Sequence, residues 1–369
     1  MGKRERMRFA LPLLAAASLA LAPGSSASPS VRFGLDDDRW LRDGPRTLAE
    51  RLDTLDRLGA KVARVTVRWE EPEWQRTDAI VRGLRARGIE PLVTLSGPRR
   101  WVVARPARAT TFGAFAGAAA RRWPWVRRWS VWERPNLELS AGTYARRLLQ
   151  PAYASIKRAS PRARVAGGES AHRDAVGWIR ALGRTGVRMD AYAHRSATGA
   201  QLGAVLREVR RSLGGIPVWL TATGVETGRR GVSEALQARD LGARALRAYR
   251  TPGVELLLHG PVRDAPRRRS GLFTTMGAAK MAAHAFSFPL AQSGRRGESV
   301  FAWGQVRPRE GRQRFRLQLL QGGETSWLGG VRTTSRHGYF TAVVQAPPGS
   351  LLRIWSVADR LFSAPLLLE

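Results

Sequence analysis

The sequence has 369 residues, of which 62 are Lys or Arg and 29 are Asp or Glu, giving a formal net charge of +33 with no Cys. The absence of Cys excludes a disulfide scaffold, a cysteine-ligated metal site and a thiol enzyme. A hydrophobic fraction of 43% without a long polar tract predicts a globular chain, with room for one large domain and a small one.

Nearly all of the positive charge is arginine, because the chain contains only four lysines. Abundant Arg together with Ala and Gly is typical of GC-rich coding sequences, so whether the basicity is functional or reflects codon bias stays open. The arginines form short runs such as 267–269, which favours a solvated surface over a single polyanion tract. At low salt we expect adhesion to nucleic acid, anionic wall polymers or anionic lipid in any case.

Residues 1–27 have the layout of a signal peptide. A basic start is followed by an apolar stretch from Phe9 to Ala22, and the small residues Ser25 and Ala27 suit cleavage after Ala27. The apolar stretch is too short to span a bilayer comfortably, and no later segment is long and apolar enough for a membrane helix. The sequence therefore predicts a secreted, extracellular protein without a membrane span.

Residues 28–292 alternate short apolar runs with amphipathic segments. Eight strand-like runs, each followed by a helix-like segment, predict an α/β fold of the (β/α)8 TIM barrel type. An open doubly wound sheet is the alternative, but no glycine-rich dinucleotide or phosphate loop follows any strand. The predicted strands begin near Val31, Val62, Glu90, Val126, Ala163, Val187, Ile216 and Val254, and the predicted helices span 47–58, 78–87, 111–122, 144–158, 174–182, 201–213, 233–249 and 275–286.

Residues 296–369 are expected to form a small C-terminal β-sandwich module. Phe315, Leu317 and Leu319 alternate with polar residues, as in a half-buried antiparallel strand. Whether this module binds sugar or only caps the barrel stays open. The predicted strands are 299–307, 314–320, 337–345 and 351–357.

The alternation of side chains along the second predicted strand assigns its two faces. Ala63, Val65 and Val67 form the apolar face expected to pack on helices, so Arg64 points into the barrel. A buried guanidinium needs a carboxylate partner to offset several kcal/mol of desolvation. We expect Arg64 to be a structural or site-organising residue.

The C-terminal ends of the predicted strands are rich in carboxylates and indoles, and this is the end where TIM barrels place their functional residues. Flat indole faces suit the apolar faces of pyranose rings, and carboxylates accept hydrogen bonds from sugar hydroxyls. Outward packing on helices is the alternative for Trp69, and the strand alternation favours it. The residues at these ends include Asp36, Asp37, Asp38, Trp69, Glu70, Glu71, Trp101, Trp132, Glu133, Glu169 and Glu226.

Two stretches resemble motifs of clan A glycoside hydrolases. VRRWSVWERPN at 126–136 is similar to their fourth-strand W-N-E-P-N motif, which carries the general acid/base, and PVWLTATGVETG at 217–228 is similar to the seventh-strand T-E-x-G motif, which carries the nucleophile. FGLDDD, ARVTVRW and AYAH extend the resemblance over the barrel in the same order. The resemblance implies a carbohydrate-binding cleft, with Arg64, Trp101, Trp132, Glu133, Asn136 and His194 as its substrate-binding candidates.

The chain departs from this pattern at both catalytic positions. Arg134 stands at the acid/base position and Ala222 at the nucleophile position. Retaining hydrolysis needs two carboxyl groups about 5 Å apart, and neither replacement can transfer a proton or attack the anomeric carbon. Glu133, Glu169 and Glu226 are the carboxylates that could substitute. For Glu133, an ion pair with Arg64 or Arg134 is the alternative.

Three functional hypotheses follow. The first is a secreted, catalytically degenerate glycoside hydrolase-like protein that binds an oligo- or polysaccharide, for which Arg134 favours an anionic cell-wall glycan. The second is an active O-glycosyl hydrolase with Glu133 as acid/base and Glu226 or Glu169 as nucleophile or water activator. The third is an exported polyanion-binding protein that uses its net charge, although no nucleic-acid motif points to a specific nucleic acid partner.

Metals and organic cofactors are not indicated. The five histidines show no metal-ligand spacing, and His194 is interpreted as a sixth-strand cleft residue. They are His172, His194, His259, His284 and His337. The sequence leaves the sugar, the linkage and the oligomeric state open.

Overall fold

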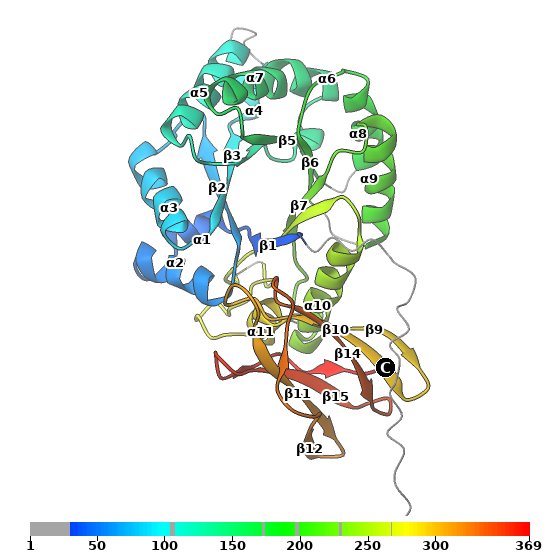
Figure 1. Ribbon diagram of the computed structural model, residues 1–369. Coiled ribbons are helices and arrows are strands. Elements are labelled where there is room, and N and C mark those ends of the chain that lie inside the picture. The colour runs from blue at the N-terminus through cyan, green and yellow to red at the C-terminus, as the bar shows by residue number, and fades with distance from the viewer. Residues whose placement is uncertain (1–29, 104–107, 172–173, 196–198, 229–230, 267) are drawn as a thin grey trace, which may run out of the picture.

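A computed structural model describes residues 30–103, 108–171, 174–195, 199–228, 231–266 and 268–369 (Figure 1). The predicted signal peptide, residues 1–27, and one of the histidines, His172, lie outside the described residues.

The first part of the chain is a closed barrel of eight parallel strands surrounded by helices (Figure 1). Each strand pairs with the next in chain order, and β1 closes the barrel on β8 with Arg32 opposite Leu256. The predicted (β/α)8 fold is therefore confirmed. The strands are β1 Arg32–Leu35, β2 Val62–Arg68, β3 Glu90–Ser96, β4 Arg128–Val131, β5 Arg164–Ser170, β6 Ala191–His194, β7 Val218–Thr223 and β8 Val254–His259.

Amphipathic helices cover the outside of the barrel. α2 begins with a capping box, in which the Thr47 hydroxyl accepts from the backbone N–H of Glu50 and the Glu50 carboxylate accepts from the backbone N–H of Thr47. The helices are α1 Asp38–Asp43, α2 Leu48–Arg57, α3 Trp74–Ala86, α4 Arg99–Val103, α5 Arg108–Arg122, α6 Ala141–Tyr144, α7 Gln150–Ala159, α8 Ala175–Gly183, α9 Gly199–Ser212, α10 Glu234–Arg250 and α11 Met281–Ser287.

Three local features differ from the sequence-based expectation. The short helices α1 and α4 were not predicted, because each is too brief to show a helical repeat. The last helix begins at Met281 rather than near residue 275, since Gly277 has a left-handed backbone (φ +88) that interrupts a helix. The predicted helix 144–158 is α7 preceded by a π-helical turn, Ala145–Leu149.

The barrel has two separate apolar layers. Ala63, Val65 and Val67 of β2 belong to the large core between strands and helices, while Val62 belongs to a smaller cluster inside the barrel with Trp219 and other inward residues. Alternation along β2 is thus as predicted, and it places Arg64 inside.

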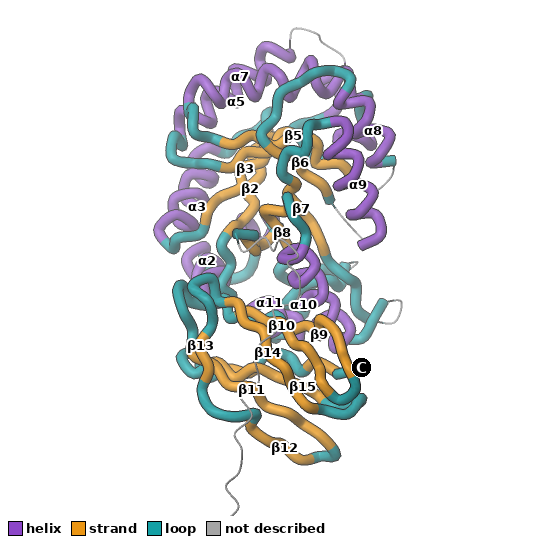
Figure 2. The backbone as a smooth tube through the Cα atoms, turned by 45° about the vertical axis from the view of Figure 1, so that its right-hand side comes forward, coloured by secondary structure: helices purple, strands orange, loops and turns teal. Residues whose placement is uncertain are grey.

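The C-terminal part forms two antiparallel sheets packed as a sandwich beside the barrel, as predicted (Figure 2). One sheet has the strand order β14-β10-β9, and the other has the order β12-β11-β15-β16. In the second sheet, β13 also pairs with β11, and β17 also pairs with β15. β9, β12, β13, β16 and β17 were not predicted, because they are very short or mainly polar. The strands are β9 Leu290–Arg296, β10 Ser299–Gln305, β11 Arg314–Gln321, β12 Glu324–Trp327, β13 Arg332–Thr333, β14 Tyr339–Gln345, β15 Leu351–Ser356, β16 Leu361–Phe362 and β17 Leu366–Leu367.

One arginine joins the sandwich to the barrel. Arg307, just after β10, is 5% exposed and lies over the ring of Phe33 in β1 at 3.8 Å. Its guanidinium also donates to the backbone carbonyl of Phe286 in α11 at 2.8 Å. Because burial disfavours the charged form, the pKa of Arg307 falls to about 9. Beside it, Trp303 and Tyr339 of the sandwich are part of the barrel's own core cluster.

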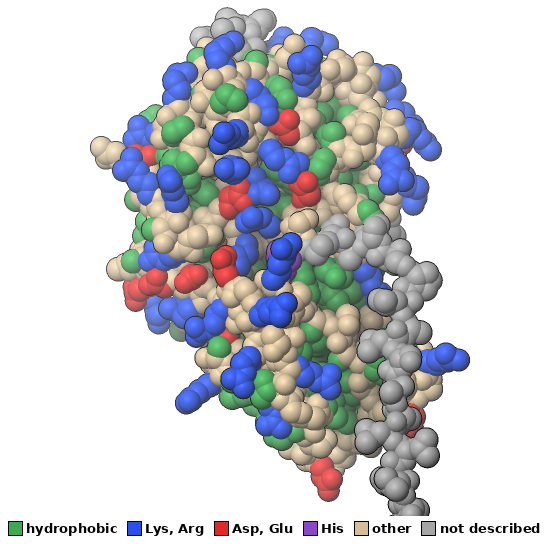
Figure 3. All heavy atoms as spheres, viewed as in Figure 1, with side chains coloured by type: hydrophobic (Ala, Val, Ile, Leu, Met, Phe, Trp, Pro, Cys, Tyr) green, Lys and Arg blue, Asp and Glu red, His purple; other side chains and the backbone are tan. Residues whose placement is uncertain are grey.

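Basic side chains are scattered over the face of the molecule shown in Figure 3, with fewer acidic ones between them. Within the part of the chain that the structure describes, none of the helices combines the length and apolarity needed to cross a membrane.

Candidate functional site

A fully buried arginine lies at the centre of the C-terminal end of the barrel, which we call the mouth. Arg64 comes from the inner face of β2, and its side chain is 0% exposed. Its guanidinium contacts Glu169 at 3.1 Å, Glu133 at 3.5 Å and Asp36 at 3.7 Å. The predicted inward orientation of Arg64 and its pairing with carboxylates are therefore confirmed.

A second arginine faces the same three carboxylates from the other side. Arg195, directly after β6, contacts Asp36 at 3.4 Å, Glu133 at 3.7 Å and Glu169 at 3.9 Å. Two guanidinium groups and three carboxylates thus form a charge cluster of five residues at the mouth. Burial opposes the charge of Arg64, but Glu169, Asp36 and Glu133 together raise its pKa, so it stays a cation.

Glu169 is enclosed by hydrogen bonds as well as ion pairs. Its carboxylate is 0% exposed and accepts from the hydroxyls of Ser130 in β4, at 3.1 Å, and Thr221 in β7, at 2.9 Å. The residue lies at the end of β5 with a left-handed backbone (φ +45), a conformation that costs energy and clusters at functional sites. Glu169 thus links three strands and has no surface to offer a ligand.

Glu133 is the member of the charge cluster that reaches solvent, with 31% of its side chain exposed. Burial raises its pKa, but the combined opposing effects of Arg64, Arg195, Arg134 and Arg68 are larger, and the pKa of Glu133 is lowered. Its Oε1 and the Oε1 of Glu169 contact the same Arg64 nitrogen, so they lie no farther apart than the sum of the two distances, about 6.6 Å. A separation within this limit is compatible with a glycosidase pair, but the lowered pKa of Glu133 keeps it ionised.

Buried hydroxyl groups support the cluster from below. The Tyr192 hydroxyl donates to Ser170 at 2.6 Å, and the Ser170 hydroxyl is 3.0 Å from Nδ1 of His194. The Tyr144 hydroxyl donates to the carbonyl of Val131 at 2.8 Å. Burial raises the pKa of both tyrosines, so they remain neutral. These groups hold the ends of β4, β5 and β6 together.

Arg134 and Ala222, which the motif resemblance aligns with two catalytic glutamates, lie beside residues of this cluster. Arg134 is exposed, and its own backbone N–H donates to the carbonyl of Glu169 at 3.1 Å. Ala222 follows Thr221 in β7 and offers only a methyl group. Glu226 is exposed in the loop after β7, and among the described residues it shares no contact with Glu133 or Glu169.

Trp132 does not provide a surface for sugar. Its side chain is 1% exposed and packs edge-on against Phe112 of α5, with ring centroids 5.8 Å apart. Trp132 has a left-handed backbone (φ +69), which turns the indole from the barrel axis toward the helices. Trp69 also packs on Phe112, as the alternation predicted, and Trp101 lies edge-on to Trp69 while keeping part of its surface exposed.

Two further substrate-binding candidates have structural partners. Asn136 donates to the carbonyl of Ala171 at 3.1 Å and accepts from its N–H at 2.8 Å, which fastens the loop after β4 to the end of β5. His194 is 0% exposed, so its ring lies beneath the surface of the mouth. His194 therefore offers no surface to a ligand, and Asn136 uses its amide in two hydrogen bonds to the backbone.

Sequence reasoning missed Arg195 as a member of the site. Its signal was its position directly after the AYAH strand, at the end where barrels place functional residues. Of the three consecutive aspartates only Asp36 joins the charge cluster, because Asp37 caps α1 and Asp38 accepts from the backbone N–H of Thr66. Within the described ranges, no three His, Asp or Glu side chains are arranged to hold a metal ion.

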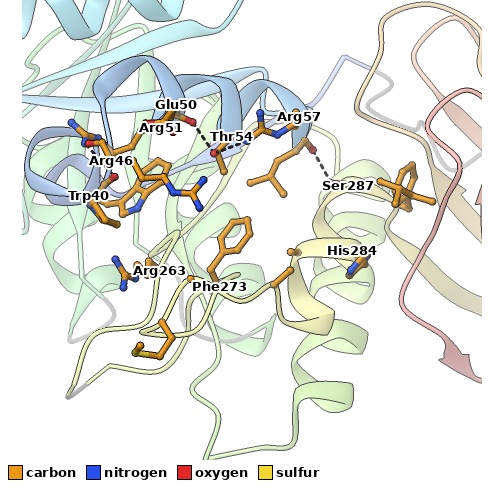
Figure 4. Close-up of a pocket in the computed structure, with 18 residues that line it drawn as sticks. Trp40, Arg46, Glu50, Arg51, Thr54, Arg57, Arg263, Phe273, His284 and Ser287 are labelled. Atoms are coloured by element: carbon orange, nitrogen blue, oxygen red, sulfur yellow. Dashed lines mark hydrogen bonds between the residues drawn. The ribbon is translucent and has the colours of Figure 1, made fainter.

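A separate cavity of about 430 Å³ lies on the flank of the barrel, between α2 and the segment joining β8 to α11 (Figure 4). Trp40 and Phe273 contribute its rings, and none of the predicted site residues lines it. One of its arginines, Arg51, is engaged with the backbone carbonyls of Leu41 and Gly44.

Solved structures share this architecture. A family 39 glycoside hydrolase from Bacteroides cellulosilyticus WH2 matches with a TM-score of 0.59 at 14% identity, over 87% of this chain and 80% of the other. The GH39 β-xylosidase of Caulobacter crescentus matches with a TM-score of 0.54 at 14% identity, over 88% of this chain and 95% of the other. A Pyrococcus horikoshii β-glycosidase matches with a TM-score of 0.54 at 11% identity, over 70% of this chain and 93% of the other.

The likeness is one of fold. These neighbours are clan A glycoside hydrolases, and at such identities they establish a glycoside hydrolase-like barrel and leave its chemistry to the residues at the mouth. Neither a scan against protein-family models nor a search of curated proteins finds a match.

Proposed function

We propose that this protein is an exported carbohydrate-binding protein built on a glycoside hydrolase-like barrel and unable to carry out the two-carboxylate reaction. One observation carries the proposal: Glu133 and Glu169 share Arg64 and Arg195 as counter-ions. The motif resemblance supports it, because it aligns Arg134 and Ala222 with the two catalytic glutamates. The fold of the glycoside hydrolase neighbours supports a carbohydrate ligand.

The charge cluster lacks both functional groups that hydrolysis requires. A general acid must hold a proton at the working pH, and the lowered pKa of Glu133 keeps it ionised. A nucleophile must reach the anomeric carbon, and Glu169 is fully enclosed. Catalysis tolerates little misplacement, so these carboxylates do not substitute for the missing pair.

The cations at the mouth favour an acidic sugar. Four arginines act on Glu133, namely Arg64, Arg195, Arg134 and Arg68, and the last two are exposed. Guanidinium groups bind carboxylates in a bidentate manner, which would orient a uronic acid or another anionic wall sugar.

Hydrolysis of a panel of activated aryl glycosides tests the loss of activity. We expect no turnover by the mature chain, and turnover gained when Arg134→Glu and Ala222→Glu are combined, with each single variant as its control. Turnover by the unmodified chain that disappears in Glu133→Gln would instead establish an active hydrolase with relocated carboxylates. If the double variant gains no activity, the absence of turnover by the unmodified chain would be the only evidence for the loss of catalysis.

Isothermal titration tests binding directly. We expect an acidic oligosaccharide to bind and Arg134→Gln to weaken it, while a neutral oligosaccharide of the same length binds less tightly. No binding to acidic or neutral wall polysaccharides would refute the proposal.

A further inference from the structure

The opposite end of the barrel, where the strands begin, carries a groove lined mainly by arginine. The cavity has a volume of about 470 Å³ and lies beside the first residues of β3, β4 and β5. We call it the basal groove. Its charged residues are Arg32, Arg85, Arg127, Arg128, Arg162 and Arg164, with Glu90 as the only acidic residue among those lining it in the described chain.

Three of these arginines are already paired with carboxylates. Arg32 and Arg128 share Glu90, with Arg32 at 3.5 Å, and Arg164 pairs with Glu255 at 2.6 Å. The ring of Trp219 lies near the guanidinium groups of Arg128 and Arg164, at 5.6 and 5.7 Å. These residues form the floor of the groove and fix its shape. Burial lowers the pKa of Arg128, and repulsion from Arg32 and Arg164 lowers it further, while the pairing with Glu90 only partly opposes them.

The outer arginines of the groove lack such partners. Arg85, Arg127 and Arg162 are exposed, and in the described residues no carboxylate lies within ion-pair distance of them. Arg85 is held over the ring of Trp125 at 4.4 Å, which directs its charge along the groove wall. Three uncompensated guanidinium groups around one concave surface create a positive potential that attracts an anion.

A second cavity extends the positive surface toward the sandwich. It has a volume of about 480 Å³ and shares Arg32, Arg128 and Arg164 with the basal groove. Its lining also includes Arg336, the glutamates Glu255 and Glu310, and Arg309, which pairs with Asp359 at 3.0 Å. A ligand that follows both cavities must therefore be elongated, with its negative charges over the basal groove.

We propose that the basal groove binds a chain segment of an anionic polysaccharide, independently of the mouth at the other end of the barrel. A cavity of this volume accommodates a drug-sized ligand, which excludes a nucleic acid duplex. Single-stranded nucleic acid is bound through aromatic rings that stack on successive bases, and Trp125 is the only aromatic residue lining the described groove, with Arg85 already over it. Repeated carboxylates on a flexible sugar chain match the spaced guanidinium groups.

The test measures binding of a fluorescein-labelled oligogalacturonate by fluorescence anisotropy. The variant combines Arg85→Gln, Arg127→Gln and Arg162→Gln. The matched control combines Arg207→Gln, Arg247→Gln and Arg296→Gln, which removes the same charge from exposed arginines that line neither cavity. A methyl-esterified oligogalacturonate of equal length provides the uncharged ligand, and thermal unfolding confirms that both variants are folded.

We expect the groove variant to bind at least about tenfold more weakly than the unmodified protein, the control variant to change by less than about threefold, and the uncharged ligand not to bind. Equal losses in the two variants would mean that binding follows net charge and would overturn the proposal. Loss in Arg134→Gln but not in the groove variant would assign the ligand to the mouth, and tighter binding of an oligothymidylate would overturn the choice of a glycan.

Discussion

Replacing Arg64 with methionine tests the charge cluster at the mouth most directly. The change removes a fully buried cation and leaves Asp36, Glu133 and Glu169 with Arg195 as their remaining shared counter-ion. Removing one partner of a buried ion pair typically costs about 3–5 kcal/mol, because the other charge stays buried without compensation. In a chain of this size we expect the midpoint of thermal unfolding to fall by about 5–10 °C at neutral pH.

The pH dependence of this loss separates electrostatics from packing. The pKa of Glu133 is lowered from 4.5 in the native protein, so its pairing stabilises the fold above that value and is lost as the pH falls through the lowered pKa. Without Arg64 the ionised Glu133 loses a cation that lies 3.5 Å away, and protonation of Glu133 relieves the resulting loss. The stability deficit of Arg64→Met should therefore shrink between pH 7 and pH 4.

Urea or thermal unfolding followed by tryptophan fluorescence measures both quantities. Arg68→Met is the matched control, because Arg68 lies on the same strand with 63% of its side chain exposed. We expect this control to unfold close to the unmodified protein at both pH values. A deficit for Arg64→Met below about 1 kcal/mol, or one of equal size at pH 7 and pH 4, would refute the reasoning.

Three further predictions concern other parts of the barrel. Burial lowers the pKa of His259 to about 3, so between that value and 6.5 the unfolded state binds a proton that the folded state does not. The stability of the fold therefore decreases as the pH drops through this range. His259→Gln should reduce the slope of the unfolding free energy against pH by up to about 1.4 kcal/mol per pH unit. Gly34→Ala should cost about 1–3 kcal/mol in denaturant unfolding, since a Cβ would overlap the carbonyl of Val62, whereas Gly330→Ala, in open space, should be nearly neutral. Trp132→Ala should cost about 3–5 kcal/mol while sugar affinity per folded molecule is unchanged, and a selective loss of affinity would contradict its place in the core.

The sequence predicted the architecture and one part of the site well, for a physical reason. Strand alternation is a local property, so it placed Arg64 inside the barrel from β2 alone. The position of Trp132 at a strand end did not predict its burial, because its left-handed backbone (φ +69) turns the side chain toward the helices just beyond β4. Alternation cannot anticipate such a residue unless it is a glycine or an asparagine.

The membership of the charge cluster could not be predicted from local patterns. Asp36, Glu133, Glu169 and Arg195 lie at the ends of four different strands, and only closure of the barrel brings them to Arg64. Many Asp and Glu residues lie at or near the ends of strands in this chain. The sequence contains no pattern that predicts that Glu169 rather than Glu226 joins the charge cluster. Burial distinguishes them, since the first is enclosed and the second is exposed.

The buried Arg307 has a consequence for anyone who divides this chain. A fragment ending at α11 would expose Phe33 and Phe286 to water and leave the carbonyl of Phe286 without the guanidinium that binds it. The severed sandwich would in turn display Trp303 and Tyr339, which now pack with Tyr249 of α10. We therefore expect the barrel and the sandwich to be destabilised when they are expressed separately, transplanted to other proteins or exchanged as gene segments.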